Sequence, residues 1–304
     1  MRRERDALFS LGRMLEAQGY AFVTPTPSTH ARVVARKLVA EDLRDVFGWN
    51  LPFEPSLLPS RMRELLVEAR ACELDGSGRL RSTVRFSTLG RHLFTHSAYP
   101  TVSADSVFFG PDTYRFCAFV ARHAPRARYV VDVGAGTGAG GIIAAEAISA
   151  ERLVLTDVNP RALAFAEINA RLAGVSAELR GGDLLAEVDG APDLVIANPP
   201  YLRDPTARAY RHGGGRFGEA ISVRLVREAA ARLAEGGTLL LYTGAPIVDG
   251  RDVFFDAIRK DLEGFDVHYE ELDPDVFGET LDEPGYEGVE RIAAVGLWAR
   301  RAAR

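Results

Sequence analysis

The residues best suited to do chemistry are four in a row, Asn198, Pro199, Pro200 and Tyr201. The side-chain oxygen of Asn198 and the main-chain carbonyl of Pro199 can accept the two N–H bonds of one NH₂ group, while the ring of Tyr201 stacks on its π system. A planar amide nitrogen is a poor nucleophile because its lone pair is delocalised. Two acceptors outside the plane of the group would push that nitrogen towards sp³ and expose the lone pair. We therefore expect this tetrapeptide to be the catalytic segment.

A second candidate site lies upstream, where the β-branched run 129–133 enters a glycine-rich turn. Gly134, Gly136 and Gly138 would let the backbone turn tightly and approach a ligand, and the helix expected next would offer unpaired N–H groups. The same residues fit a dinucleotide-binding fingerprint, and a tight turn that binds nothing would also contain them. By itself the loop predicts only a strand, a turn and a helix.

Acidic residues are expected at the ends of three successive strands. Asp132 precedes the glycines, Asp157 follows the next strand signal, and Asp183 follows the third. A carboxylate at the position of Asp157 can accept both hydroxyls of a ribose. Beside these acids, Val158 and Leu184 could enclose a flat ring. Each acid also has a simpler interpretation, as a helix N-cap or a solvated loop charge.

Strand and helix signals alternate from about residue 105 onwards, which predicts an α/β fold with a mostly parallel sheet. Strands are expected at 129–133, 153–156, 177–179, 194–197, 238–242, 267–271 and 292–298. Helices are expected at 114–122, 138–150, 160–172, 219–234 and 252–262. The last two strand signals have no clear helix between them, so we expect an antiparallel edge strand.

The first hundred residues predict a smaller domain of helices followed by a β-hairpin, in a winged-helix-like or helical arrangement. Helical spacing is found at 8–15 and 33–43, and a third helix is expected from Ser60 as its N-cap. Alternating residues at 80–86 and a second run at 93–96 predict the hairpin. The chain changes character between about residues 97 and 106, so we expect domains at 1–100 and 101–304.

Composition narrows the class of protein. With 304 residues, 47% of them hydrophobic, the chain can bury two cores. A net charge of −5 argues against a surface that binds nucleic acid everywhere, although the first hundred residues are slightly basic. The charged N-terminus is not followed by an apolar stretch of signal-peptide or membrane-spanning length, which predicts a cytoplasmic protein that does not bind membranes. The two cysteines lack metal-ligand spacing, so no metal is predicted.

These features together resemble class I S-adenosylmethionine-dependent methyltransferases. Asp132 directly before the glycines, Asp183 after the third strand and the 198–201 tetrapeptide favour this resemblance over a nicotinamide enzyme. It implies a Rossmann-like, seven-stranded, mostly parallel sheet. It also implies that S-adenosyl-L-methionine, which becomes S-adenosyl-L-homocysteine, is held by a set of strand-end residues: Asp132, Gly134, Gly136, Gly138, Asp157, Val158, Asp183, Leu184 and Asn198.

The resemblance is closest to the amino methyltransferases that carry Asn-Pro-Pro-Tyr, which include the HemK/PrmC glutamine methyltransferases of release factors and the adenine-amino methyltransferases of DNA and RNA. Segments 107–113 and 213–218 resemble HemK/PrmC segments before the first strand and after the tetrapeptide. Gly110, Tyr114 and Tyr242 depart from the pattern of that family. The locally basic loop 202–212 could steer an anionic partner. We expect substrate-binding roles for Phe109, Thr113, Arg203 and Arg211.

The resemblance implies an S-adenosylmethionine-dependent N-methyltransferase. The expected acceptor is a protein glutamine side chain, with residues 1–100 docking the protein partner. An adenine-amino methyltransferase of RNA or DNA and a small-molecule N-methyltransferase are the alternative enzymes. A fold that survives only as a binding module would have lost the donor or acceptor residues, and both sets are present.

Overall fold

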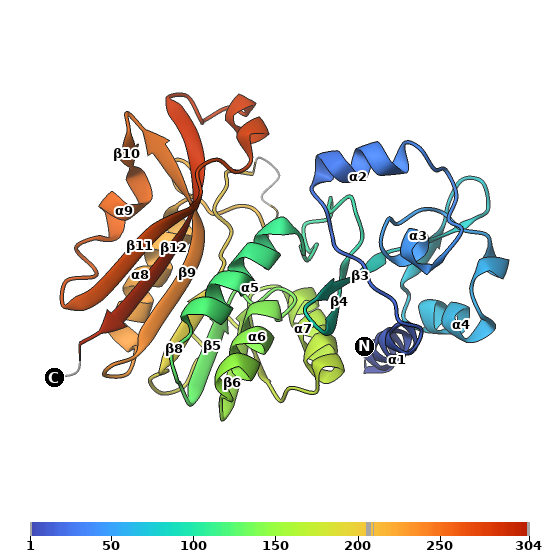
Figure 1. Cartoon of the computed structure of the whole chain (residues 1–304), viewed down its shortest axis with the longest axis horizontal. Helices are drawn as coiled ribbons and strands as arrows, with labels where there is room; N and C mark the ends of the chain where they lie inside the picture. The colour runs from blue at the N-terminus through green and yellow to red at the C-terminus, as the bar shows by residue number, and fades with distance from the viewer. Residues whose placement is uncertain (1, 205–207, 209, 303–304) are drawn as a thin grey trace.

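The computed structural model describes residues 2–204, 208 and 210–302. Two parts lie side by side along the long axis of the molecule (Figure 1). The larger part contains the central sheet and the C-terminus, and the smaller part contains the first hundred residues. In the described part of the chain, no helix is both long and apolar enough to cross a membrane.

A mostly parallel sheet forms the centre of the larger part, which confirms the predicted fold class. Its parallel strands are β5 (Tyr129–Val133), β6 (Arg152–Asp157), β7 (Glu178–Gly181), β8 (Leu194–Ala197) and β9 (Thr238–Val248). The helices are α5 (Pro111–His123), α6 (Ala139–Ile148), α7 (Pro160–Ala173), α8 (Ala220–Arg232) and α9 (Val253–Ile258). Apolar clusters pack on both faces of the sheet, which explains why β8 is buried along its whole length.

The antiparallel strand is not at the edge of the sheet, so that prediction is wrong. The strand order is β11-β12-β9-β8-β5-β6-β7, with the two-residue β10 (Arg251–Asp252) paired to β9. Strand β12 (Val289–Arg301) lies between β9 and β11 (Phe265–Asp273) and is antiparallel to both. The chain places β11 one position away from β9, and β12 then fills the gap. Both edges of β12 are hydrogen-bonded to neighbouring strands, so its largely buried residues lie inside the sheet.

The helical region of the smaller part is more broken than the sequence predicts. Its helices are α1 (Arg2–Ala17), α2 (Pro27–Val34), α3 (Leu43–Phe47), η1 (Pro55–Leu57) and α4 (Ser60–Glu68). The single helix predicted over 33–43 is wrong. The side chain of Asp42 caps a new helix by accepting from the Asp45 N–H at 2.9 Å. At α4 the N-cap is Pro59, and Ser60 is the first helical residue.

Two small antiparallel sheets follow, β1 (Cys72–Leu74) with β2 (Leu80–Ser82) and β3 (Val84–Leu89) with β4 (His92–Ser97). The second is the predicted hairpin. The single strand predicted over 80–86 is wrong because Thr83 leaves the ladder and donates its N–H to the Ala71 carbonyl. Ser82, Val84 and Phe86 are buried as the alternation predicts, but Arg85 is also only 3% exposed instead of facing solvent, because both faces of β3 are covered here.

The hairpin is fixed to the larger part through α7. Asn169 on α7 accepts from the Thr95 N–H at 2.8 Å and donates to the Thr95 carbonyl at 3.0 Å. Phe165 and Leu172 on the same helix belong to one apolar cluster with residues of α1 and β3. The two parts therefore share a core, and the smaller part is held in place as a wall beside the sheet (Figure 1).

Candidate functional site

A cavity of about 900 Å³ lies between the two parts, at the carboxyl edge of the parallel strands. The loops after β5, β6, β7 and β8 line one side, as expected for ligand sites of open α/β sheets. Residues of the smaller part and of segment 275–283 line the remainder. The predicted donor loop and the Asn198 tetrapeptide therefore face a common space.

The glycine loop borders open space. Gly134 and Gly136 have φ values of 65° and 54°, which L side chains rarely adopt. A Cβ atom at Gly134 would meet no other atom within 4 Å. Gly138, with φ 76°, is the N-cap of α6 and packs closely on Leu155, where a Cβ would lie 3.1 Å from a methyl carbon. The first two glycines thus leave room for a ligand, and the third allows the helix to pack on the sheet.

Asp132 lies at the N-terminus of α6, between the sheet and the cavity. Its side chain accepts from the Gly141 N–H at 2.7 Å and is 1% exposed. Burial raises the pKa of this carboxyl to about 7, with the carboxylate of Asp157 adding to the effect. A cationic group bound at this place would favour the ionised form.

Asp157, at the end of β6, is held in a fixed orientation by two backbone N–H groups. Its Oδ2 accepts from Gly136 at 2.9 Å, and its Oδ1 accepts from Asn159 at 2.8 Å. Burial raises the pKa of this carboxyl. Each carboxylate oxygen has two lone pairs, so both oxygens can still accept a hydroxyl hydrogen from a ligand.

The apolar residues expected at a flat ring differ in exposure. Val158 is 61% exposed although it lines the cavity, whereas Leu184 is 8% exposed. Asp183 also lines the cavity, but its Oδ1 accepts from Arg224 on α8 at 2.5 Å. An exposed valine at the cavity wall leaves an apolar surface that a planar ligand can cover.

Asn198 carries no side-chain hydrogen bond to any residue that the structure describes, and it lines the cavity. The carbonyl of Pro199 likewise accepts no hydrogen bond within the described ranges. Pro200 and Tyr201 line the same wall. Neither oxygen acceptor is therefore engaged within the described part of the chain, which is unusual for groups that are not fully solvated.

Tyr201 is anchored instead of free. Its ring packs on Gly244, where a Cβ atom would lie 2.2 Å from the ring. Its hydroxyl donates to the carboxylate of Asp112. The same carboxylate accepts from Tyr242 at 3.1 Å and from Arg115 at 3.2 Å. Burial raises the pKa of Asp112, and burial beside this carboxylate raises that of Tyr201. The cluster fixes the ring that borders the cavity.

The structure brings three of the four predicted substrate-binding residues to the cavity. Phe109 stacks on His96 with a centroid distance of 5.1 Å, and Thr113 accepts from the Gly110 N–H at 3.2 Å. Arg211 lines the cavity from the loop after β8. Arg203 is not among the lining residues and packs over Gly285.

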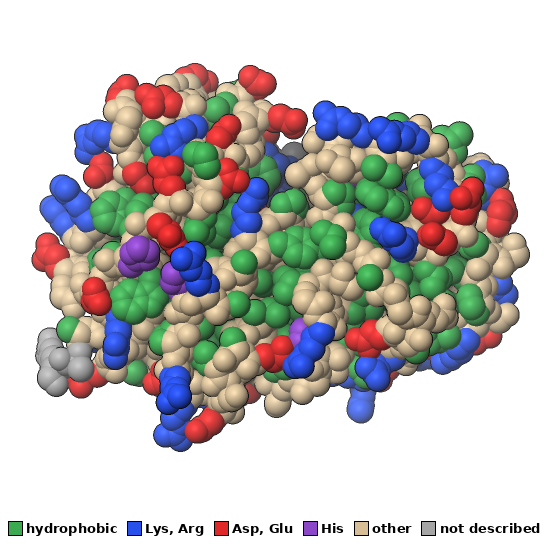
Figure 2. Space-filling model, in the orientation of Figure 1, with side chains coloured by type: hydrophobic (Ala, Val, Ile, Leu, Met, Phe, Trp, Pro, Cys, Tyr) green, Lys and Arg blue, Asp and Glu red, His purple; other side chains and the backbone are tan. Residues whose placement is uncertain are grey.

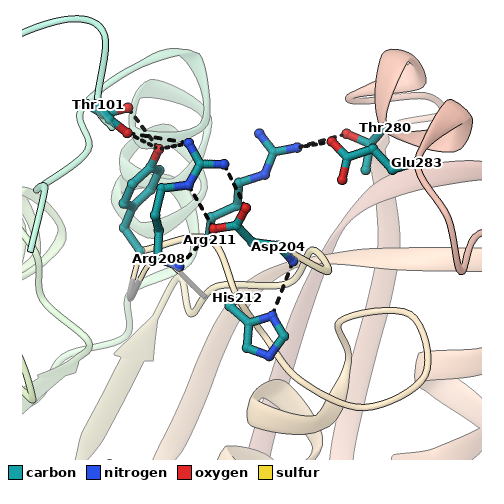
Figure 3. A network of polar contacts seen from close by, with 8 residues as sticks. Thr101, Asp204, Arg208, Arg211, His212, Thr280 and Glu283 are labelled. Carbon is teal, nitrogen blue, oxygen red and sulfur yellow. Dashed lines mark hydrogen bonds and ion pairs between the residues drawn. The ribbon is translucent and has the colours of Figure 1, made fainter. Parts of the chain in front are cut away.

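A polar network joins the loop after β8 to the segments around it (Figure 3). Arg208 donates to both carboxylate oxygens of Asp204, at 2.7 and 2.8 Å. Tyr210 bonds Thr101 at the start of the larger part. Arg211 donates to Glu283 and to Thr280 from the other side of the cavity. The described residues of this loop are therefore attached to a segment on each side of it.

The smaller part contributes to the cavity through residues that the sequence did not single out. Thr24, His30, Arg85 and His96 all line the cavity. Asp112 was also missed as the anchor of Tyr201, although it lies in segment 107–113. Single-sequence patterns carry no signal for these contacts because the partners are far apart along the chain.

Several comparisons identify the class of protein. Residues 117–247 match the family described as "Methyltransferase small domain". The Pyrococcus horikoshii protein PH0793 has the same fold, with a TM-score of 0.51 at 16% identity, over 91% of this chain and 99% of that chain. Residues 117–247 therefore resemble a class I methyltransferase domain, a class whose cofactor is S-adenosyl-L-methionine.

Curated relatives narrow the resemblance within that class, and the domain is similar to those of the HemK/PrmC glutamine methyltransferases. The "Release factor glutamine methyltransferase" of Deinococcus radiodurans is 38% identical over 37% of this chain and 44% of its own length. Its namesake in Mycolicibacterium smegmatis is 36% identical over 39% and 46%. "Ribosomal RNA small subunit methyltransferase C" of Sodalis glossinidius is 29% identical over 42% and 34%. The chain thus spans less than half the length of each of these relatives.

The residues at the cavity fit the cofactor. The open space beside Gly134 and the buried carboxyl of Asp132 suit its amino-acid part. The fixed carboxylate of Asp157 suits its ribose, and the uncovered Val158 suits its adenine.

Proposed function

We propose that the chain is an S-adenosylmethionine-dependent N-methyltransferase that acts on a planar amide nitrogen, and that the acceptor is a glutamine side chain of a protein. The observation that carries the proposal is the open pair of oxygen acceptors at Asn198 and Pro199. They lie in the same cavity as the glycine loop. The names of the first relatives support glutamine as the acceptor.

The chain's own residues would prepare the nitrogen for attack. The Asn198 side chain and the Pro199 carbonyl would accept the two N–H bonds of the acceptor amide and draw it out of conjugation. Tyr201, held by Asp112, would fix the plane of that amide. The bound cofactor would supply an electrophilic methyl group: the nitrogen–carbon bond would form as the carbon–sulfur bond breaks, S-adenosylhomocysteine would leave, and the nitrogen would lose one proton to solvent. Positioning then provides much of the rate, so a strong general base is not needed.

We propose that residues 1–100 dock the protein partner. The two rims of the cavity differ in charge. Arg32 and Arg36 are exposed on and just after α2, where Figure 2 shows basic side chains along the edge of the smaller part. Across the cavity, segment 275–283 carries four acidic residues. A polar peptide with charges of both signs would be oriented by these rims. A cytoplasmic location stays a prediction.

The test is to follow labelled methyl groups. The protein is incubated with methyl-labelled S-adenosylmethionine and a cell lysate, and the label is sorted into protein, RNA and small molecules. We expect N5-methylglutamine in a protein after enzymatic digestion, and no such product with Asn198→Ala. Label that never reaches a nitrogen, or that reaches the same product with Asn198→Ala, would contradict the proposal.

An RNA acceptor is the second candidate, and it is favoured by the relative named for ribosomal RNA. The exposed arginines near α2 would then contact phosphates. Binding would weaken steeply as salt rises, and the label would be found on a base. Label confined to protein excludes this candidate.

A further inference from the structure

Arg85 is a buried cation without a counter-charge. It lies on β3, is 3% exposed and lines the cavity. Its Nε and Nη2 are sealed from solvent and have no hydrogen-bond partner. No ion pair joins Arg85 to any acidic residue in the described ranges. The Phe22 ring, 5.3 Å from Cζ, is the aromatic contact of this guanidinium. An unpaired buried charge is costly, and an anion that enters the cavity would remove that cost.

The polar groups around Arg85 are already used by one another. His96 donates from Nδ1 to the Ser97 carbonyl and accepts the Ser87 hydroxyl at Nε2. The Ser87 hydroxyl in turn contacts Thr24 at 2.5 Å. This chain of bonds leaves the guanidinium out. His30, which also lines the cavity, has an unpartnered and sealed Nδ1.

Together, Arg85, His30 and His96 carry a single positive charge. Burial lowers the pKa of Arg85 to about 10, so the guanidinium stays protonated at neutral pH. Burial beside Arg85 lowers the pKa of His30 to about 4 and that of His96 well below its ordinary value, so both imidazoles are neutral. One positive charge matches one negative charge. A carboxylate also fits the planar fork of a guanidinium.

We propose that the guanidinium of Arg85 forms a carboxylate-binding subsite in the wall that residues 1–100 contribute to the cavity. The carboxylate has two available sources, the amino-acid end of the cofactor and the methyl acceptor. The second source rests on the proposed function. The subsite itself does not.

The first experiment titrates the wild-type protein with acetate and with inorganic phosphate at constant ionic strength. The Nε–Hε signal of Arg85 is followed by NMR and assigned by its loss in Arg85→Lys. We expect a saturable shift with acetate, a weaker response to phosphate, and no shift for Arg81, a partly exposed arginine on β2 that does not line the cavity. An unmoved Arg85 signal, or tighter binding of phosphate, would overturn the proposal.

The second experiment separates the two sources by calorimetry. S-adenosylhomocysteine carries the amino-acid end, and 5′-methylthioadenosine lacks it. If the cofactor is the source, Arg85→Met weakens S-adenosylhomocysteine about tenfold or more, while 5′-methylthioadenosine binds as before. If the acceptor is the source, both nucleosides bind normally and acetate still shifts Arg85 with S-adenosylhomocysteine bound.

Arg81→Met is the matched control and should leave every affinity unchanged. Arg85→Met should unfold at the same or a higher temperature than the wild type, because it removes an unpaired buried charge. The subsite would be refuted if acetate binds elsewhere in the cavity. In that case the Arg85 signal of the wild type would not move, and an acetate response would persist in Arg85→Met. These readouts measure binding, so they can succeed or fail whether or not methyl transfer to nitrogen is found.

Discussion

The cavity wall contains two kinds of polar group. Around Asp112, the hydroxyls of Tyr201 and Tyr242 and the guanidinium of Arg115 all bond to one carboxylate. At Asn198 and Arg85, by contrast, the side chains border the same cavity without such partners in the part of the chain that the structure describes. Paired groups hold the wall in shape, and unpaired groups are available to a ligand. Substitutions should therefore affect stability at the first kind and binding or rate at the second.

The largest effect is expected at Asn198. Asn198→Ala removes one of the two acceptors for the amide hydrogens, so kcat should fall about 10²–10³-fold, as for the loss of one group that stabilises a transition state. Cofactor affinity, measured by calorimetry, should stay close to that of the wild type. Equal loss of cofactor binding would mean that Asn198 holds the donor instead of the acceptor.

We expect the charge of Asp132, a buried acid at the cavity, to change the stability of the folded protein with pH. Its pKa in the folded protein is about 7, above the ordinary 3.8, so the cofactor-free folded state binds this proton more tightly than the unfolded state does. Stability should therefore fall as pH rises between these values and stay level above about 7.

Asp132→Asn removes that titration. Relative to the wild type, the variant should gain up to about 4 kcal/mol in the free energy of unfolding between pH 4 and pH 8. Urea unfolding at several pH values measures this difference. A constant difference across the range would show that the burial of Asp132 does not perturb its proton affinity.

Asp112 should behave as a scaffold residue. Asp112→Ala leaves two buried hydroxyls without their acceptor and should lower the free energy of unfolding by about 3 kcal/mol. Tyr242→Phe is the control, because it removes one hydrogen bond and keeps the ring, and it should cost about 1 kcal/mol. An Asp112→Ala protein as stable as the wild type, yet inactive, would reverse the assignment.

The smallest effect is expected for Tyr201→Phe. The variant keeps the ring that borders the cavity and loses only the bond to Asp112, which should cost about 1 kcal/mol of stability. We expect little change in kcat, measured at saturating substrate. A large fall in kcat with unchanged stability would give the hydroxyl a catalytic role.

Much of the larger part could be predicted from local patterns. Ligand sites of parallel sheets lie at the carboxyl ends of the strands. The glycines after strand 129–133 and the tetrapeptide at 198–201 could therefore be predicted to meet at one edge of the sheet. The order of the last strands was not predicted, because it depends on which of them pairs with β9. The apolar run of β12 fits the central position that it takes, and the more polar β11 lies at the edge.

The smaller part was predicted less well, for a physical reason. Asp42 starts a new helix and Thr83 ends a strand, and single hydrogen bonds decide both breaks. Arg85 is buried although the alternating pattern predicts it to be exposed, because both faces of β3 are covered at this point.

The sequence by itself determined the α/β alternation, the glycine turn and the Asn-Pro-Pro-Tyr motif, because these depend on neighbouring residues and on the period of a strand or helix. Only the tertiary structure decided which polar groups acquire partners. Asp112 meets Tyr201 and Tyr242 across long stretches of chain, while Arg85 and Asn198 reach the cavity without such partners. Pairing of buried groups depends on distances that the whole fold sets, so it cannot be read from spacing along the chain.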